Sequence, residues 1–173
     1  MSSSSPFNAI KGIVDEIGLC ETAGATAATV VMAYVGIDAM AYLNMPIGQT
    51  SQTRKDFIEW VDRYMKADPA QVYQYDGKDV YGARCAMVHT YSIEADFHLK
   101  NPSTKQFGYS DGGRHAHDPA VHPNLVIIGV ASFANDFKHA VLRFAQEMAA
   151  DLDLRARVES RLEKFVQTFP FAH

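Results

Sequence analysis

The chain has 173 residues, of which 47% are hydrophobic, so it is long enough for one well-buried core and too short for two ordinary domains. Its formal net charge of -4 argues against a nonspecific nucleic-acid coat protein, because such proteins bind the phosphate backbone through clustered Lys and Arg. Any contact with RNA must therefore be local. We predict one domain over residues 1–173, with disorder at 1–6.

The ends and the cysteines of the chain bear on its location. The serine-rich start has no basic region followed by an apolar core, as a signal peptide would have. The most apolar stretch, 23–43, carries Asp38 and is typical of a buried helix. Cys20 and Cys85 are too few for a disulfide framework. We therefore expect a cytoplasmic protein with no membrane span.

The first half of the chain shows helical spacing of apolar residues. This spacing predicts amphipathic helices over 7–19 and from residue 52 to about 66, and a more uniformly apolar central helix over 25–43. A fourth helix follows Asp79, which is a plausible N-cap.

In the second half of the chain, the helical spacing of apolar residues stops after Ser92. Polar and apolar residues alternate over 96–100 and 105–109, and a short apolar run covers 125–130. These segments predict a small antiparallel β-meander within an insertion at 94–130. Helical spacing returns over 131–150 and in a last helix that carries Leu154 to Val166. The predicted fold is mainly α, a bundle of about six helices with the meander inserted after the fourth.

The fourth helix carries the most informative feature, the run from Arg84 to His89. An arginine fork binds two phosphate oxygens at once, and a histidine can take a proton from a ribose hydroxyl or return one to a leaving oxygen. The pair is sufficient, in principle, for RNA cleavage without a metal. Such a pair also arises by chance at this spacing, and either cation alone could cap a helix C-terminus.

The spacing of Arg84 and His89 has a geometric consequence. At about 100° per residue, five steps leave the two residues roughly 140° apart around the helix axis. Three arrangements could bring them together. The helix bends or ends near His89, the long arginine reaches around it, or two copies of the helix meet across a two-fold axis and pool two Arg and two His in one cleft.

Three runs, 35–41, 57–64 and 81–92, together resemble a HEPN-type protein. HEPN domains are helical bundles whose signature is an arginine, four to six residues, and a histidine, and many act as metal-independent RNases in toxin, antiphage and RNA-processing systems. Arg84 and His89 match the signature at its shortest spacing. Active members often have Asn, Asp or His directly after the arginine, whereas this chain has Cys85.

The resemblance implies a function and partners. It implies an endoribonuclease with a composite site at a homodimer interface, where Arg84 binds the scissile phosphate and His89 acts as base or acid. The product would carry a 2′,3′-cyclic phosphate. It also implies an RNA or nucleotide ligand and, for a toxin, an antitoxin or regulatory partner. Because the family includes binding and scaffolding members, a noncatalytic nucleotide- or protein-binding module is the alternative.

Other residues are candidates for supporting roles. Asp38 lies in an apolar helix and needs a partner, for which Arg84 or His89 is our first expectation; a purely structural ion pair is the alternative. Hydroxyl groups could contact phosphate or ribose, although they are more often solvated or bonded back to the chain. The residues in question are Thr90, Tyr91 and Ser92.

The remaining histidines suggest a metal site only weakly. A histidine-rich loop has the residue types for one, but no cysteine pair or HExxH helix accompanies it, so we expect no metal and no cofactor. Its candidate ligands are His115, His117, Asp118 and His122. We expect His98 to face solvent on the meander and His139 to lie on the polar face of its helix.

Overall fold

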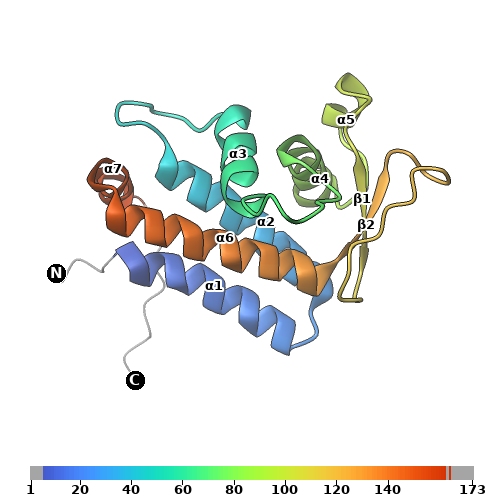
Figure 1. Ribbon diagram of the computed structural model, residues 1–173, viewed down its shortest axis with the longest axis horizontal. Coiled ribbons are helices and arrows are strands. Elements are labelled where there is room, and N and C mark those ends of the chain that lie inside the picture. Colours follow the sequence, from blue (N-terminus) through green and yellow to red (C-terminus); the bar gives the residue numbers. More distant parts are fainter. Residues whose placement is uncertain (1–5, 163, 165–173) are drawn as a thin grey trace.

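The computed structural model describes residues 6–162 and 164, and this part of the chain is mainly helical, as predicted (Figure 1). Its seven α-helices are α1 (Pro6–Thr22), α2 (Thr26–Asn44), α3 (Arg54–Trp60), α4 (Gly77–Thr90), α5 (Asp96–Lys100), α6 (Val130–Ala150) and α7 (Leu152–Leu162). A π-helical turn, η1 (Val61–Met65), continues α3. The long predicted helices are confirmed, whereas Phe165 and Val166, predicted for the last one, lie outside the described residues.

Helix α2 is the centre of the bundle. It contacts α1, α3, α4, α6 and α7, and α1 and α6 lie side by side across one face of the molecule (Figure 1). Among the described residues, α2 is also the one helix long and apolar enough to cross a membrane, yet half of its most apolar window is buried in the bundle. The nearly continuous apolar sequence of α2 is explained by this packing on several sides.

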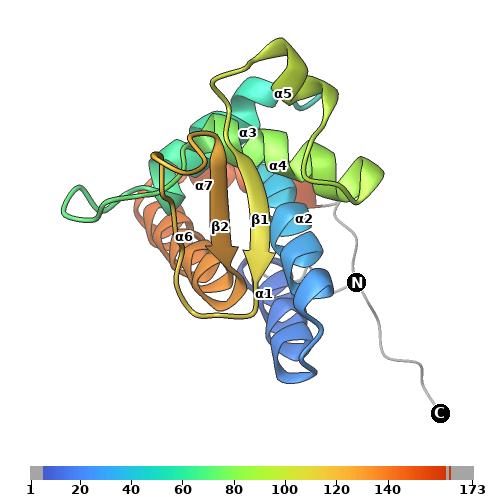
Figure 2. The same cartoon turned by 90° about the vertical axis from the view of Figure 1, so that its right-hand side faces the viewer.

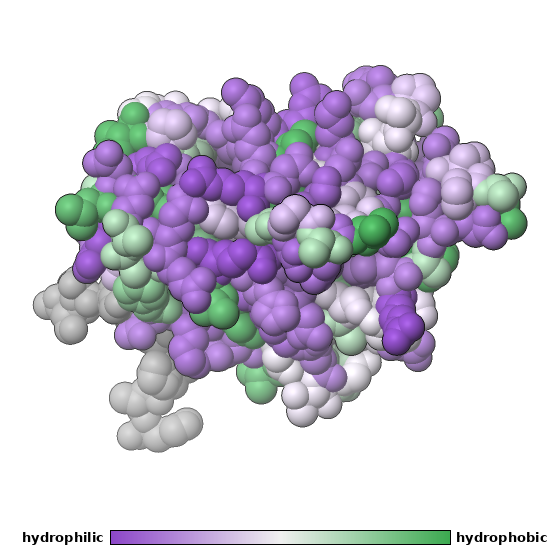
Figure 3. Space-filling model, in the orientation of Figure 1, coloured by the Kyte–Doolittle hydropathy of each residue, from purple (hydrophilic) through white to green (hydrophobic). Residues whose placement is uncertain are grey.

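The surface seen in the orientation of Figure 1 is mostly hydrophilic, with apolar side chains scattered singly over it (Figure 3). Such scattered residues are ordinary on a folded protein. The amphipathic pattern of α6 fits this arrangement, because its aromatic residues Phe133, Phe137 and Phe144 are buried in the core.

The predicted antiparallel meander is wrong. The described residues form two strands, β1 (Gln106–Ser110) and β2 (Leu125–Gly129), which pair in parallel with Gln106 opposite Leu125 (Figure 2). The alternation over 105–109 and the apolar run over 125–130 located both strands but could not give their direction. The connection over 111–124 is long enough to carry the chain back to the starting end of β1, and within it Ala116 bridges to Ile127 in the antiparallel sense.

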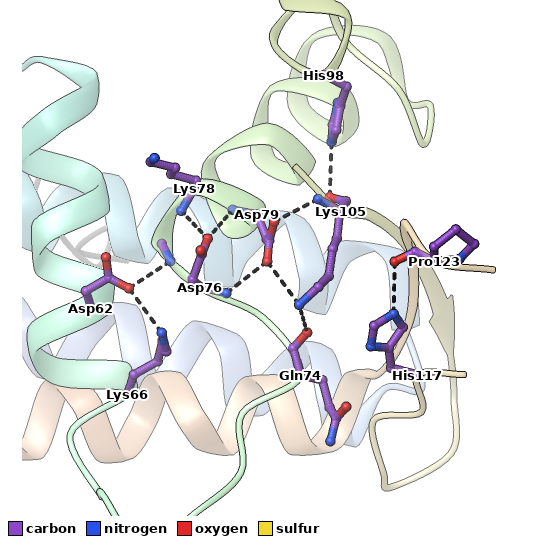
Figure 4. Close-up of polar contacts among 11 residues, drawn as sticks. Asp62, Lys66, Gln74, Asp76, Lys78, Asp79, His98, Lys105, His117 and Pro123 are labelled. Atoms are coloured by element: carbon purple, nitrogen blue, oxygen red, sulfur yellow. Dashed lines mark hydrogen bonds and ion pairs between the residues drawn. The ribbon is translucent and has the colours of Figure 1, made fainter. Parts of the chain in front are cut away.

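The first predicted strand, 96–100, is instead the short helix α5, which is why there are seven helices rather than about six. Its residue His98 does not face solvent as predicted: it is 5% exposed, and its Nδ1 accepts from the Ala95 N–H at 3.1 Å. Its Nε2 lies 3.3 Å from the Lys105 carbonyl oxygen (Figure 4). Alternation over five residues also fits one turn of helix, and local hydrogen bonds decide between the two.

The start of α4 is fixed by two aspartates. Asp76, rather than the predicted Asp79, is the N-cap, and its Oδ1 accepts from the N–H groups of Lys78 and Asp79 at 2.9 Å. Asp79 is buried and accepts from the N–H of Asp76 at 3.0 Å and of Lys105 at 2.7 Å (Figure 4). Burial raises the pKa of Asp79, while these hydrogen bonds act against the shift. The network holds α4 against the residue that precedes β1.

Replacing Asp79 with alanine is expected to lower the free energy of unfolding by about 1–3 kcal/mol, because two partly buried backbone N–H groups lose their acceptor. Urea unfolding followed by circular dichroism measures the change. Lys78→Ala is the control, since Lys78 is exposed on the same helical turn. Equal stability of the two variants would contradict a structural role for Asp79.

Candidate active site

The candidate site lies where α4 contacts α2. Arg84 of α4 donates from Nε to Asp38 Oδ2 at 2.8 Å, and its Nη2 lies 2.7 Å from the same oxygen. Both side chains are mostly buried, with 21% of Arg84 and 27% of Asp38 exposed. The expected partner of Asp38 is therefore confirmed as Arg84.

Burial and charge oppose each other in this ion pair. Burial raises the pKa of Asp38, and the hydrogen bond and charge of Arg84 act against that rise. Burial also disfavours the charged form of Arg84, but the hydrogen bond and charge of Asp38 outweigh it and raise the pKa of the guanidinium. The two opposite charges therefore stabilise each other in a partly dry environment.

Arg84 also reaches His89 within the same chain. Its Nη1 lies 2.9 Å from Nε2 of His89, in the last turn of α4, which ends at Thr90. Of the three arrangements considered from the sequence, two are observed together within one chain: the long arginine side chain reaches around the helix, and the helix ends near His89. Because a guanidinium can only donate, Nε2 must accept, which places the proton of a neutral imidazole on Nδ1. The Nε2 lone pair of the exposed His89 ring therefore faces the guanidinium, and another donor must take the place of Arg84 before Nε2 can accept its proton.

The hydroxyl residues after His89 are largely bonded back to the chain. Thr90 Oγ1 donates to the Ala86 carbonyl at 2.9 Å, and Ser92 Oγ donates to the Glu94 carbonyl at 2.6 Å. Tyr91 is exposed and ends α4 in the left-handed region with φ of 51°. Thr90 and Ser92 are therefore bonded back to the chain at the end of α4, which was the alternative to a contact with phosphate or ribose.

Cys85, the residue after the signature arginine, is half-buried and faces Tyr81 one turn earlier on α4. Burial raises the pKa of Tyr81, and the Cys85 thiol adds to the rise. Cys85 thus lies against an aromatic wall of the site.

The histidine-rich loop does not gather into a metal centre. His115 Nε2 lies 3.2 Å from Asp136 Oδ2 on α6, and its Nδ1 accepts from the Gly129 N–H at 3.2 Å. His117 Nε2 lies 3.2 Å from the Pro123 carbonyl oxygen (Figure 4). Over residues 6–162 and 164, the structure holds no group of three or more His, Cys, Asp or Glu side chains placed to bind one ion. His139 is exposed on α6, as expected.

A small open pocket of about 170 Å³ adjoins the ion pair. It is lined by Asp38, Gln52, Thr53, Arg54, Phe57, Tyr81 and Arg84. The sequence did not reveal Gln52 or Arg54, because the charges around residue 54 alternate as on any solvated helix face. They approach Arg84 only through the packing of α3 against α2 and α4.

The arrangement can bind an anion and accept a proton at adjacent points. The Arg84 guanidinium supplies the fixed cation, and His89 supplies the acceptor 2.9 Å away. Comparison of the chain with protein-family models, with curated proteins and with solved structures finds no match. The chemistry of these side chains is therefore the basis for a function.

Proposed function

We propose that this protein is a metal-independent endoribonuclease of the HEPN type, with Arg84 and His89 as its catalytic residues. The observation that carries the proposal is the constellation of Asp38, Arg84 and His89 at the contact of α2 and α4. A guanidinium has five N–H groups. Those directed to Asp38 and His89 leave one N–H on each terminal nitrogen, which is the fork that two phosphate oxygens require.

The reaction follows from the order of these groups. The ribose 2′-hydroxyl takes the place of the Arg84 N–H as the donor to His89 Nε2, which then accepts the hydroxyl proton. The 2′-oxygen attacks the phosphorus while Arg84 stabilises the charge on the phosphate oxygens. The bond to the 5′-oxygen breaks, and this oxygen takes a proton from the imidazolium that His89 has become. The products are a 2′,3′-cyclic phosphate and a free 5′-hydroxyl. In a homodimer, the equivalent histidine of the second copy would supply the proton to the leaving oxygen instead.

Exposed apolar side chains beside the site support the homodimer. Val35 lies one helical turn from Asp38 and is 44% exposed, and Val88 lies one turn from Arg84 and is 37% exposed. Pairing two copies through this surface would cover the valines and bring two Arg84–His89 pairs together. The contact of Arg84 with His89 within one chain means that dimerisation adds a second pair rather than completing the first.

Light scattering at micromolar concentration is expected to give twice the 19.1 kDa mass of the chain. Val88→Lys is expected to shift the protein toward monomer, because it places a charge in the centre of the contact. Leu152→Lys, which places a charge at an exposed position of α7, is the control. A wild-type monomer under these conditions would contradict the dimer.

Cleavage assays test the nuclease directly. Single-stranded RNA is expected to be cut in the presence of EDTA, and DNA of the same sequence is expected to stay intact because it lacks the attacking 2′-hydroxyl. Loss of activity in EDTA, restored by a divalent cation, would contradict the metal-independent mechanism.

A noncatalytic nucleotide- or protein-binding module is the second candidate, and Cys85 favours it because active HEPN proteins often have a polar residue there. In that case the pocket beside Arg84 would bind a ligand without cleaving it. If the wild-type protein binds RNA but does not cut it, Cys85→Asn tests whether this one position silences the site.

A further inference from the structure

We propose that the pocket beside Arg84 binds the nucleotide next to the scissile phosphate, with Arg54 on that nucleotide's phosphate and Gln52 on its base. As a statement about substrate recognition the proposal rests on the nuclease function, but the binding itself does not require cleavage. Neither residue has a part in the proton transfer assigned to His89.

The charge of the pocket is the first reason. Its lining holds two arginines, Arg54 and Arg84, and one carboxylate, Asp38, which is already paired with Arg84. The lining is therefore positive, although the whole chain carries a formal charge of -4. A local positive pocket in an acidic protein selects an anion at this point rather than coating the molecule with nucleic acid.

The position of Arg54 is the second reason. Its guanidinium lies over the ring of Phe97 with the Cζ atom 5.7 Å from the ring centroid, and Phe97 contacts Tyr81 edge to face at 5.0 Å between centroids. The structure records no ion pair for Arg54 in the described ranges, whereas its neighbour Lys55 pairs with Glu59. Arg54 is thus oriented by an aromatic face while its N–H groups stay available to a phosphate.

The size and the walls of the pocket are the third reason. At about 170 Å³ it is smaller than the roughly 300–1,000 Å³ of sites that enclose a drug-sized ligand, so it suits one unit of a longer chain. Tyr81 supplies an aromatic surface, over the buried ring of Phe57. The amide of Gln52 offers both donors and an acceptor to the edge of a base. One phosphate, one aromatic wall and one amide are the features that a single nucleotide needs.

The test measures binding of a single-stranded oligonucleotide with 2′-O-methyl groups, which cannot be cleaved by attack of the 2′-oxygen. Fluorescence anisotropy is expected to show roughly 10- to 100-fold weaker binding for Arg54→Gln, as for the loss of one charge-assisted hydrogen-bonded contact. The slope of log K against log salt is expected to become shallower by roughly 0.7, the value for one phosphate contact on a single strand. Lys55→Gln is the matched control and is expected to change neither quantity.

Gln52→Ala tests the proposed contact with the base separately from the contact with the phosphate. It is expected to weaken binding without changing the salt slope, because an amide releases no counterion. In cleavage assays with unmodified RNA, Arg54→Gln is expected to raise KM and leave kcat nearly unchanged, the pattern for a contact made equally in the bound and transition states.

The possible results distinguish a failure of the proposed nucleotide-binding pocket from a failure of the proposed nuclease function. If RNA is bound in an Arg54-dependent way but never cleaved, the nuclease function fails and the pocket stands. If RNA is cleaved but Arg54→Gln matches Lys55→Gln in binding, salt slope and KM, the pocket is overturned and the nuclease stands. If the wild-type protein neither binds nor cleaves RNA, both are overturned.

Discussion

Replacing His89 with alanine is expected to lower the rate of RNA cleavage by roughly 10²- to 10⁴-fold, the usual effect of losing a general acid or base. The fold is expected to survive, because His89 is exposed in the last turn of α4 and its ring contacts a side chain rather than the core. Initial rates on one RNA substrate measure the loss, and thermal unfolding checks the fold.

His139→Ala is the matched control for this variant. His139 is another exposed histidine on a helix, near the middle of α6, and has no place in the proposed chemistry. It is expected to retain full activity. Equal activity of His89→Ala and the wild-type protein would remove His89 from the mechanism.

Replacing Arg84 with lysine is expected to lower cleavage by roughly 10²- to 10³-fold, the effect of losing one preorganised donor to a developing negative charge. An ammonium is a point charge and cannot contact Asp38, His89 and two phosphate oxygens at once. The measured quantity is again the initial rate, and near-wild-type activity of Arg84→Lys would contradict the bidentate role.

Arg84→Gln has a second expected effect, on stability. It leaves Asp38 without its cation, which is expected to cost about 1–3 kcal/mol of unfolding free energy at neutral pH. Without Arg84 the pKa of Asp38 rises further, above its value in the unfolded chain, so stability falls as pH rises through that range. The cost should therefore shrink on acidification.

The double variant Asp38→Asn with Arg84→Gln separates the two roles of the arginine. It removes both charges, so stability is expected to return to within about 1 kcal/mol of the wild type. Activity is not expected to return, because no cation remains for the phosphate. Recovery of activity would show that Arg84 acts on Asp38 rather than on RNA.

Long helices were predictable from the sequence because their pattern extends over several turns. The apolar spacing of α1, α2 and α6 gave their positions. The isolated Asp38 in an apolar helix predicted a partner, Arg84 or His89, and the structure shows Arg84. A buried carboxylate needs a partner, and few cationic side chains were expected close enough to Asp38 to pair with it. These predictions depend on residues close in sequence or on a strong energetic requirement.

Strand direction and the short helix were not predictable in the same way. Five alternating residues at 96–100 fit a strand and one turn of helix equally well, and only the hydrogen bonds of His98 decide. The direction of β2 depends on the path of residues 111–124, which no periodicity records. The pocket residues Gln52 and Arg54 also depend on tertiary packing, because nothing in their spacing connects them to Arg84.

The contact of Arg84 with His89 shows that the angle between two positions on a helix does not decide whether their side chains can touch. Their positions are roughly 140° apart around the axis, which suggested a second copy as one way to unite them. The length of the arginine side chain closes the gap within one chain, and the helix ends one residue after His89. The proposed homodimer therefore depends on the exposed valines and needs its own measurement.

End-group analysis of the cleaved RNA is the most direct measurement of the proposed chemistry. RNA incubated with the protein in EDTA is expected to yield fragments with 2′,3′-cyclic phosphate and 5′-hydroxyl ends, as mass spectrometry would show. A single 2′-deoxy substitution at a cleaved position is expected to block cutting there and nowhere else, because it removes the attacking oxygen. Fragments with 3′-hydroxyl and 5′-phosphate ends, or cutting that continues at the 2′-deoxy position, would contradict a mechanism built on Arg84 and His89.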